Sequence, residues 1–364
     1  MAVYLVNELL VCLWGVAFLV PHRWSPSVKT GRRLFVSVCF FQMFLLAAFR
    51  SQIGYDYFMY SKGFLLMDIE GFSSLHYLDW EVGFVLYTKL VGLFTNNILI
   101  YHGVTAAFCL VSWAVFFYRH SRGLWLSVIL FLNFYFLYLN MNFLRQAIAI
   151  AITLYAWPFL KKRKFWPFAA IVGAAALFHT TALILLLLYP LTALKPGVGV
   201  WLLYGYGLLF FYISSQGILD LLTTVFHQEY AGSVFLQGMS FLYGLMPVVL
   251  LVPCFLLRKP LLAEAPANRY LLGMLFFTAF CMLMMTRHAI LERFSYYSLA
   301  YCTLLLPELA LSVGKQGWKG DKKGNGSPGG WLLLTVGAAV VTFGYHLFGL
   351  LENAHGVVPY QWIL

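Results

Sequence analysis

The sequence predicts an all-α protein of the polytopic membrane class, a helix bundle with about 11 to 12 transmembrane segments. Three observations lead to this fold class. Of the 364 residues, 62% are hydrophobic and only 10% are charged, whereas soluble domains carry roughly 25% charged residues. Long apolar runs recur along the chain, and basic residues are concentrated between them. A water-soluble globule is excluded, because the chain lacks the polar side chains needed to cover its surface.

Each predicted span is an apolar run close to the roughly 20 residues that cross a bilayer. The runs cover residues 2–20, 34–49, 97–118, 124–140, 143–160, 198–214, 238–257, 270–286, 296–314 and 331–351. We expect the first run to remain in the protein, because no basic residue precedes it and no A-x-A cleavage site follows it. The run 165–194 predicts two short antiparallel helices, and the stretch 82–95, which contains Lys89, predicts a re-entrant or interfacial helix.

The basic residues predict the orientation of the chain. With both termini outside, the inner loops hold 18 of the 24 Lys and Arg residues, as the positive-inside rule requires. The net charge of +11 therefore needs no nucleic acid as a partner. The whole chain, residues 1–364, is expected to form a single integral membrane domain. It has two long outer loops, 50–96 and 215–237, and a Gly- and Lys-rich cytoplasmic linker, 315–330.

No cofactor is predicted from the sequence. The six Cys residues are scattered singly within apolar runs and form no CxxC or Cys/His spacing, so they are interpreted as small core side chains rather than metal ligands. Two acid-x-acid pairs, Asp68 with Glu70 and Asp79 with Glu81, lie in the first outer loop. Their oxygens are suited to a divalent cation, but acidic loops often contain such pairs. We therefore predict no metal site.

Charged groups at membrane depth cost about 2.5–3.5 kcal/mol each, so those near the ends of apolar runs are candidates for function. The second run ends at Arg50, and Asp56, Tyr57 and Tyr60 follow it. If a helix begins near Gly54, Asp56 and Tyr60 share one helical face. The structural alternative is an Arg50–Asp56 ion pair that fixes the loop.

A second group opens the run 143–160. Asn142, Arg145 and Gln146 lie on one helical face, and Asn142 is a suitable cap for the helix amino terminus. A helix amino terminus that carries an Arg is a favourable place for a phosphate, because backbone donors and the guanidinium point the same way. Alternatively, Arg145 reaches the outer headgroups.

The third candidate is His179, at the turn of the hairpin predicted for 165–194. Its imidazole is able to take a proton near neutral pH, although a lone His in an apolar stretch is often structural.

The fourth group follows the run 270–286. Its candidate residues are Arg287, His288, Arg293 and Tyr297, and a solvated turn with salt bridges would show the same pattern.

All four groups fall on the outer side in the predicted orientation, although that orientation was inferred from other residues. Outer Arg residues beside a His and several carboxylates suit an anionic, lipid-borne ligand such as a phosphate or pyrophosphate. Aromatic residues of the first outer loop are suited to stacking on sugar rings, and equally to an interfacial belt.

At these residues the sequence resembles the EpsG family of Wzy-type polysaccharide polymerases. The resembling segments are Phe49-Arg50, Gly54 to Tyr57 with Tyr60, Glu81 to Phe84, Asn142 to Gln146, Phe178 to Leu183, Arg293 with Tyr297, and Val358 to Tyr360. They occur in this order over most of the chain. The sequence has Thr180-Thr181 where Ser is expected near the His, and this change keeps a hydroxyl group.

The resemblance implies a glycosyltransferase with GT-C-like membrane architecture. It would join oligosaccharide repeats linked to undecaprenyl diphosphate at the outer face of the bacterial cytoplasmic membrane. Membrane lipid and a chain-length regulator protein are the further partners it implies. A lipid-linked oligosaccharide flippase or other transporter, or an O-antigen-type ligase, remains as an alternative.

The hypothesis assigns roles to the candidate residues. Arg50, Arg145 and Arg293, with Arg287, would hold the diphosphate, because preorganised cations stabilise the departing anion. His179 or Asp56 would be the base for the acceptor hydroxyl, and Glu81 would orient the base or the acceptor. The further substrate-binding candidates are Tyr57, Tyr60, Asn142, Gln146, His288, Tyr297 and Tyr360.

Overall fold

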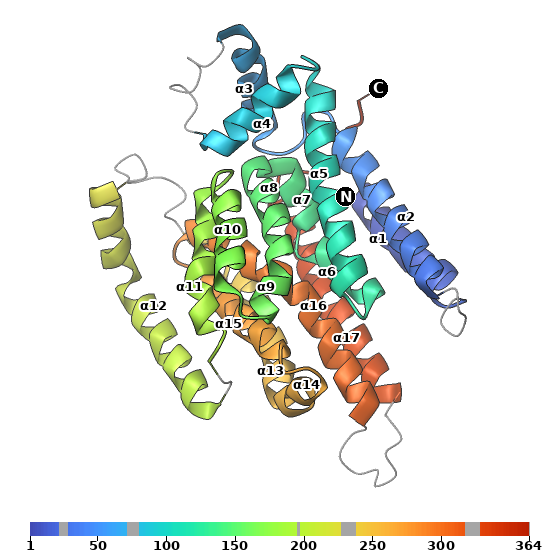
Figure 1. The fold of residues 1–364 in the computed structure, drawn as a ribbon, viewed down its shortest axis with the longest axis vertical. Coiled ribbons are helices and arrows are strands. Elements are labelled where there is room, and N and C mark those ends of the chain that lie inside the picture. The colour runs from blue at the N-terminus through green and yellow to red at the C-terminus, as the bar shows by residue number, and fades with distance from the viewer. Residues whose placement is uncertain (22–27, 71–79, 195–196, 227–237, 317–327, 364) are drawn as a thin grey trace. The chain divides into compact units, whose positions relative to one another are not determined.

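The computed structural model describes residues 1–21, 28–70, 80–194, 197–226, 238–316 and 328–363. Helices, joined by turns, make up the fold of these residues, and an isolated bridge between Arg50 and Trp362 is their only β-type pairing. Figure 1 shows the helices with their labels. An all-α membrane protein is the fold class that the sequence predicts, and the structure confirms it.

The contacts divide the chain into two compact units, one of residues Met1–Leu183 and Ala339–Leu364, the other of Ile184–Ala338. The first unit contains α1 (Ala2–Trp14), α2 (Val28–Ala48), α3 (Tyr57–Glu70), α4 (Val82–Gly92), α5 (Ile98–His120), α6 (Leu124–Asn133), α7 (Phe136–Asn142), α8 (Leu144–Thr153), α9 (Trp157–Lys161) and α10 (Phe165–Ala176). The carboxyl-terminal part of α17 (Pro328–Leu351) also belongs to it. The sequence predicts one domain, and each unit is described separately below.

The second unit contains α11 (Ile184–Leu191), α12 (Val198–Phe226), α13 (Phe241–Leu256), α14 (Arg258–Glu264), α15 (Asn268–Met284) and α16 (Glu292–Gln316). Within it, α15 packs against α13 and α16. The predicted linker 315–330 falls largely on residues outside the described part of the chain. Residues 215–226 of the predicted outer loop 215–237 are instead helical, because α12 continues to Phe226, and residues 227–237 lie outside the described part.

Six helices of the described chain are long and apolar enough to cross a membrane, and the number rises to eight if each of two bent helix pairs is one span. This is fewer than the 11 to 12 segments expected, although each predicted run contains a helix. The difference arises because several runs are broken. In the run 124–140, α6 and α7 meet at an angle of 45°, where Tyr135 adopts a positive φ of 64°. In the run 143–160, a 3-10 turn at Leu154–Ala156 separates α8 from α9.

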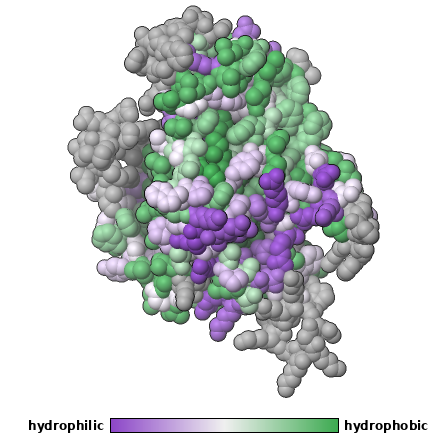
Figure 2. Space-filling view, in the orientation of Figure 1, coloured by the Kyte–Doolittle hydropathy of each residue, from purple (hydrophilic) through white to green (hydrophobic). Residues whose placement is uncertain are grey.

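Helix α1 shows how the sequence pattern matches a lipid environment. Val6, Leu9 and Leu13 of α1 recur at helical spacing with Val16 of the π-helical turn that follows (Gly15–Leu19), and each is more than half exposed. Polar residues of the same helix, including Asn7 and Glu8, are buried. This arrangement reverses that of a soluble amphipathic helix. Figure 2 shows apolar side chains over much of one face of the molecule, with hydrophilic ones gathered in one area.

The carboxyl-terminal segment runs along the residues that follow α2. The Ser51 N–H donates to the Gln361 carbonyl at 2.9 Å, and the Ile363 N–H donates to the Phe49 carbonyl at 3.0 Å. The Gly54 N–H donates to the Gly356 carbonyl at 3.0 Å. This segment thus fixes the backbone on which α3 begins.

Candidate active site

Glu81 lies directly before α4, where the backbone is extended, and its carboxylate joins two other segments of the first unit. Oε2 accepts a hydrogen bond from Arg145 Nη1 at 2.7 Å, and Oε1 lies 2.7 Å from His179 Nδ1. The Thr180 N–H also donates to Oε1, at 3.2 Å. The structure therefore brings together three predicted site residues, since Arg145 and His179, which are 64 and 98 positions from Glu81 in sequence, both contact its carboxylate.

A glycine two residues after Glu81 makes this approach possible. The Gly83 N–H donates to the Leu177 carbonyl at 2.8 Å. A Cβ at Gly83 would lie 2.7 Å from that carbonyl oxygen, closer than real Cβ contacts. Any other residue would push the start of α4 away from the end of α10. Since His179 follows Leu177 by two residues, Gly83 sets the distance between the carboxylate and the imidazole.

Arg145 enters the site from the first turn of α8. The chain breaks from helical geometry at Phe143, between α7 and α8. Leu144, Ala147 and Ile148, which are buried in an aromatic-rich core, hold this turn in place. The Arg145 side chain is 21% exposed, so its guanidinium is partly accessible as well as paired with Glu81.

Aromatic side chains form the wall beside this cluster. Tyr60 of α3 is 2% exposed and packs against Trp80 and Phe84, with ring centroids 5.6 Å away in both cases. Burial raises the pKa of Tyr60, and the positive charge of Arg145 opposes the rise. The Trp80 ring covers Gly63, where a Cβ would lie 2.2 Å from it. These contacts fasten α3 to the residues that lead into Glu81.

The neighbours of Glu81 keep it ionised. Burial would raise its pKa, but the hydrogen bond from His179 and the charge of Arg145 outweigh burial and lower the pKa to about 2. A carboxylate accepts only, so His179 Nδ1 carries the proton in their hydrogen bond. When the imidazole is uncharged, its Nε2 carries no proton, and Nε2 makes no hydrogen bond to any side chain that the structure describes. Such a nitrogen is able to accept a proton from a ligand.

Arg50 has a different environment from the one expected. Its guanidinium donates to the Ala47 carbonyl and, at 3.1 Å, to the Met141 carbonyl, at the last turns of α2 and α7. Helix carboxyl termini attract cations, so Arg50 needs no carboxylate. The side chain is 1% exposed, and burial lowers its pKa to about 10, at which it stays cationic at neutral pH. The geometry gives Arg50 a structural role and leaves little surface for a diphosphate.

His102, which the sequence analysis missed, completes the Arg50 network. Its Nδ1 lies 3.2 Å from Arg50 Nη2, and its Nε2 lies 3.0 Å from Ser61 Oγ. The Tyr57 ring stacks on the imidazole at 4.7 Å. Tyr57 therefore belongs to this buried network rather than to the Glu81 cluster. In the sequence, His102 is only a His within an apolar run, and nothing there indicates that it faces Arg50.

Other predicted binding residues hold backbone segments. Asn142 Nδ2 donates to the His355 carbonyl at 2.7 Å, and Tyr360 donates to the Leu46 carbonyl at 2.8 Å. Gln146 is 2% exposed. Asp56 is partly exposed at the turn before α3, and its carbonyl accepts from the Tyr60 N–H at 3.1 Å.

The fourth predicted group lies in the second unit. Arg287 Nη1 donates to the Tyr212 carbonyl at 2.5 Å, and His288 Nε2 lies 3.1 Å from Ser215 Oγ. Arg293 is partly buried and Tyr297 is fully buried on α16. The gathering of Arg293 with the first-unit residues stays a prediction, since the two units are described separately.

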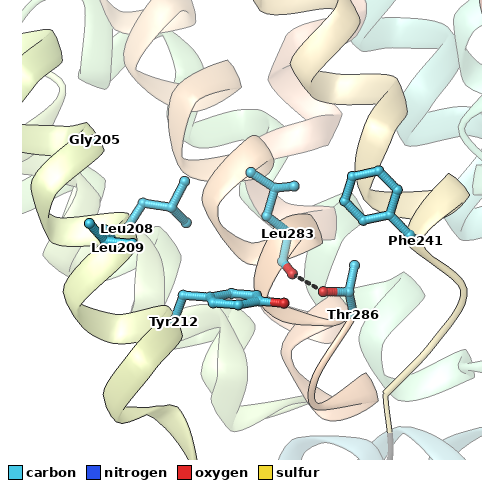
Figure 3. A pocket seen from close by; sticks show the side chains of 7 residues that line it. All are labelled: Gly205, Leu208, Leu209, Tyr212, Phe241, Leu283 and Thr286. Atoms are coloured by element: carbon cyan, nitrogen blue, oxygen red, sulfur yellow. Dashed lines mark hydrogen bonds between the residues drawn. The ribbon is translucent and has the colours of Figure 1, made fainter.

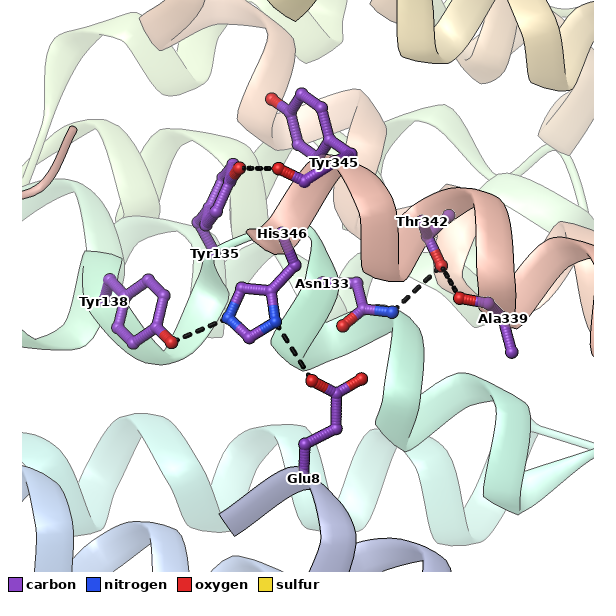
Figure 4. Close-up of polar contacts among 8 residues, drawn as sticks. All are labelled: Glu8, Asn133, Tyr135, Tyr138, Ala339, Thr342, Tyr345 and His346. Carbon is purple, nitrogen blue, oxygen red and sulfur yellow. Dashed lines mark hydrogen bonds and ion pairs between the residues drawn. The ribbon is translucent and has the colours of Figure 1, made fainter. Parts of the chain in front are cut away.

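A second buried polar cluster connects α1, α6, α7 and α17 within the first unit (Figure 4). His346 Nδ1 lies 3.0 Å from Glu8 Oε2, and His346 Nε2 lies 2.7 Å from the Tyr138 hydroxyl. The Asn133 amide is within 3.0 Å of Thr342 and 2.9 Å of Glu8. Glu8 is the one charged residue in the first apolar run, and that signal was available in the sequence.

No group of three or more His, Cys, Asp and Glu side chains arranged for a metal ion occurs among the residues that the structure describes. This finding does not test the two acidic pairs considered in the sequence as cation ligands. The side chains of Asp68, Glu70 and Asp79 fall outside the described part.

The fold and the polar clusters define a multi-pass, all-helical membrane protein with a partly exposed Arg–Glu–His cluster. The chain belongs to the EpsG family, which it matches over residues 33–362, and the resemblance seen in the sequence is confirmed. Membership indicates a membrane protein of the polysaccharide-polymerase type. No curated protein and no solved structure matches the chain.

Proposed function

We propose that the protein is a polysaccharide polymerase that joins oligosaccharide repeats carried on undecaprenyl diphosphate. It would act as a GT-C-like glycosyltransferase at the outer face of the bacterial cytoplasmic membrane. Family membership supports the general class. The observation that carries the catalytic part is the hydrogen-bonded series Arg145–Glu81–His179, with 2.7 Å contacts on both carboxylate oxygens.

In this proposal His179 is the general base. The acceptor sugar hydroxyl gives its proton to Nε2 as its oxygen attacks the anomeric carbon of the donor sugar. The bond from that carbon to the lipid diphosphate breaks, and the diphosphate leaves with the bonding electron pair. Glu81 holds the imidazole through Nδ1 and stabilises the imidazolium that forms. General-base catalysis of this kind contributes about 10²–10⁴ in rate.

Arg145 is the cation we assign to the departing diphosphate. It is partly exposed and lies beside the carboxylate that orients the base, so leaving group and base would be held by one cluster. A preorganised cation in a partly dry site supplies several kcal/mol of transition-state stabilisation. Arg293 and Arg287 remain proposed diphosphate ligands from the second unit, and Asp56 remains the second candidate for the base.

The test uses purified protein in lipid nanodiscs with synthetic lipid-diphosphate repeat units. A ladder of products supports a polymerase, whereas a single transfer to another acceptor indicates a ligase. Lipid movement without a covalent change indicates a flippase. Either of the last two results would refute the proposal.

Variants then test the residue roles. We expect His179→Ala and Arg145→Ala to abolish chain extension while the protein still inserts and folds. The matched controls are His120→Ala and Arg119→Ala, near the end of α5, which should extend chains normally. Full-length polymer from both site variants at normal expression would show that these residues are not the catalytic ones.

A further inference from the structure

A groove in the second unit lies between α12 and the residues at the ends of α13 and α15 (Figure 3). Its volume is about 270 Å³. On one side, Gly205, Leu208 and Tyr212 line it at the i, i+3, i+7 positions of α12, which lie on a single helical face. This face of α12 therefore borders an open space rather than a packed helix.

The opposite wall of the groove is also apolar. Phe241, Leu283 and Thr286 line it, and the Thr286 hydroxyl donates to the Leu283 carbonyl at 2.6 Å. The one hydroxyl on this wall is thus satisfied internally, as the dashed line in Figure 3 shows. A ligand in the groove would meet mainly hydrocarbon surface.

Contacts at both ends hold α12 away from its neighbours. Toward its start, Tyr204 stacks on Phe276 with ring centroids 4.2 Å apart, and Trp201 packs edge-on against the same ring at 5.0 Å. Further along, Arg287 donates to the Tyr212 carbonyl. Between these contacts, a Cβ at Gly205 would meet nothing within 4 Å. The aromatic contacts and the Arg287 hydrogen bond therefore set the width of the groove between α12 and its neighbours.

The two ends of the groove differ in polarity. The Arg287 guanidinium lies 4.7 Å from the centroid of the Tyr212 ring, which lines one end, and Arg287 is exposed. Gly205 lines the other end, seven residues earlier, or about 10 Å along the helix. A cation at one end of an apolar groove matches an amphiphile with an anionic head and a hydrocarbon tail.

We propose that this groove binds the part of the polyprenyl chain nearest the diphosphate, with Arg287 at the phosphate. The inference rests on the proposed function, since that function supplies the polyprenyl diphosphate. A diphosphate carries more negative charge than a phospholipid headgroup, and a guanidinium binds phosphate oxygens in a bidentate manner. Charge complementarity thus favours the lipid-linked substrate over bulk phospholipid.

The experiment measures photolabelling in nanodiscs with a polyprenyl diphosphate that carries a diazirine on its first isoprene units. Gly205→Leu fills the groove and should lower labelling of α12 and α15 by about tenfold, the loss expected from excluding about two methylene groups. Gly207→Leu is the matched control, because it lies on the same helix outside the groove lining and also has open space at its Cβ. It should label like the unmodified protein.

A second variant tests the headgroup. Arg287→Gln should reduce labelling by the diphosphate probe and leave labelling by a photoreactive polyprenol, which lacks phosphate, unchanged. Equal labelling of Gly205→Leu and the unmodified protein would overturn the proposal. Equally strong groove labelling by a photoreactive phosphatidylglycerol, or cross-links between α12 helices of two copies, would overturn it as well.

The labelling needs no glycosyl transfer, so the two proposals fail separately. Labelled groove residues without product ladders would refute the polymerase function alone. Ladders with no labelling of the groove would refute the lipid site alone.

Discussion

Replacing Glu81 by Gln tests whether the carboxylate charge organises the candidate site. The amide keeps the size of the side chain and an oxygen that is able to accept from Thr180 or His179. It removes the negative charge that faces both Arg145 and His179. We therefore expect a less stable protein at neutral pH and slower chain extension.

The magnitude follows from the pKa of Glu81, which is lowered from 4.5 to about 2. One pKa unit is worth about 1.4 kcal/mol, so the folded state favours the carboxylate over a neutral group by about 3 kcal/mol. Because the folded pKa is depressed, this stability is present above pH 4.5 and is lost as the pH falls toward 2. At pH 3 about 1.4 kcal/mol remains.

Thermal unfolding of the purified protein between pH 3 and 7 measures this effect. The difference in melting temperature between the unmodified protein and Glu81→Gln should be largest above pH 5 and should shrink toward pH 3. The matched control is Glu352→Gln, which changes an exposed carboxylate and should give no such trend. A difference that stays constant with pH would refute the assigned electrostatics. For activity, we expect kcat to fall by about 10- to 100-fold, the worth of a hydrogen bond to a charged group.

Variants at three more positions test other parts of the first unit. Gly83→Ala should push α4 away from the Leu177 carbonyl and lower kcat by at least about tenfold, and the idea fails if its kcat is unchanged. Arg50→Ala should lower stability by about 1–3 kcal/mol, since two carbonyls lose their donor. Arg50→Lys should keep activity per folded molecule, and a specific rise in KM for lipid-linked substrate would instead favour a diphosphate contact. Glu8→Leu should lower the melting temperature more than Glu8→Gln, because only the amide still accepts a hydrogen bond from His346; equal melting temperatures would remove any role for this contact.

The candidate site shows how far sequence reasoning reaches. Arg145 and His179 were identifiable because polar groups are costly beside apolar runs, whereas Glu81 was noticed through its acidic pair with Asp79 and through the family resemblance. Their partners were not, because Glu81 meets Arg145 and His179 across 64 and 98 residues. The sequence favoured an Arg50 that binds phosphate. Only the packed structure showed that two helix carboxyl termini surround this guanidinium.

The sequence by itself determined the all-helical membrane class, since so apolar a chain must satisfy its backbone hydrogen bonds internally within lipid. It also determined the approximate positions of the membrane helices, because each long apolar run must form a helix to satisfy its backbone hydrogen bonds in lipid. The tertiary structure decided where those runs break, as at Tyr135, whose hydroxyl donates to the Tyr345 carbonyl from α17. It also decided which polar groups meet, because such contacts depend on close approach between distant segments, as at Gly83 and Leu177.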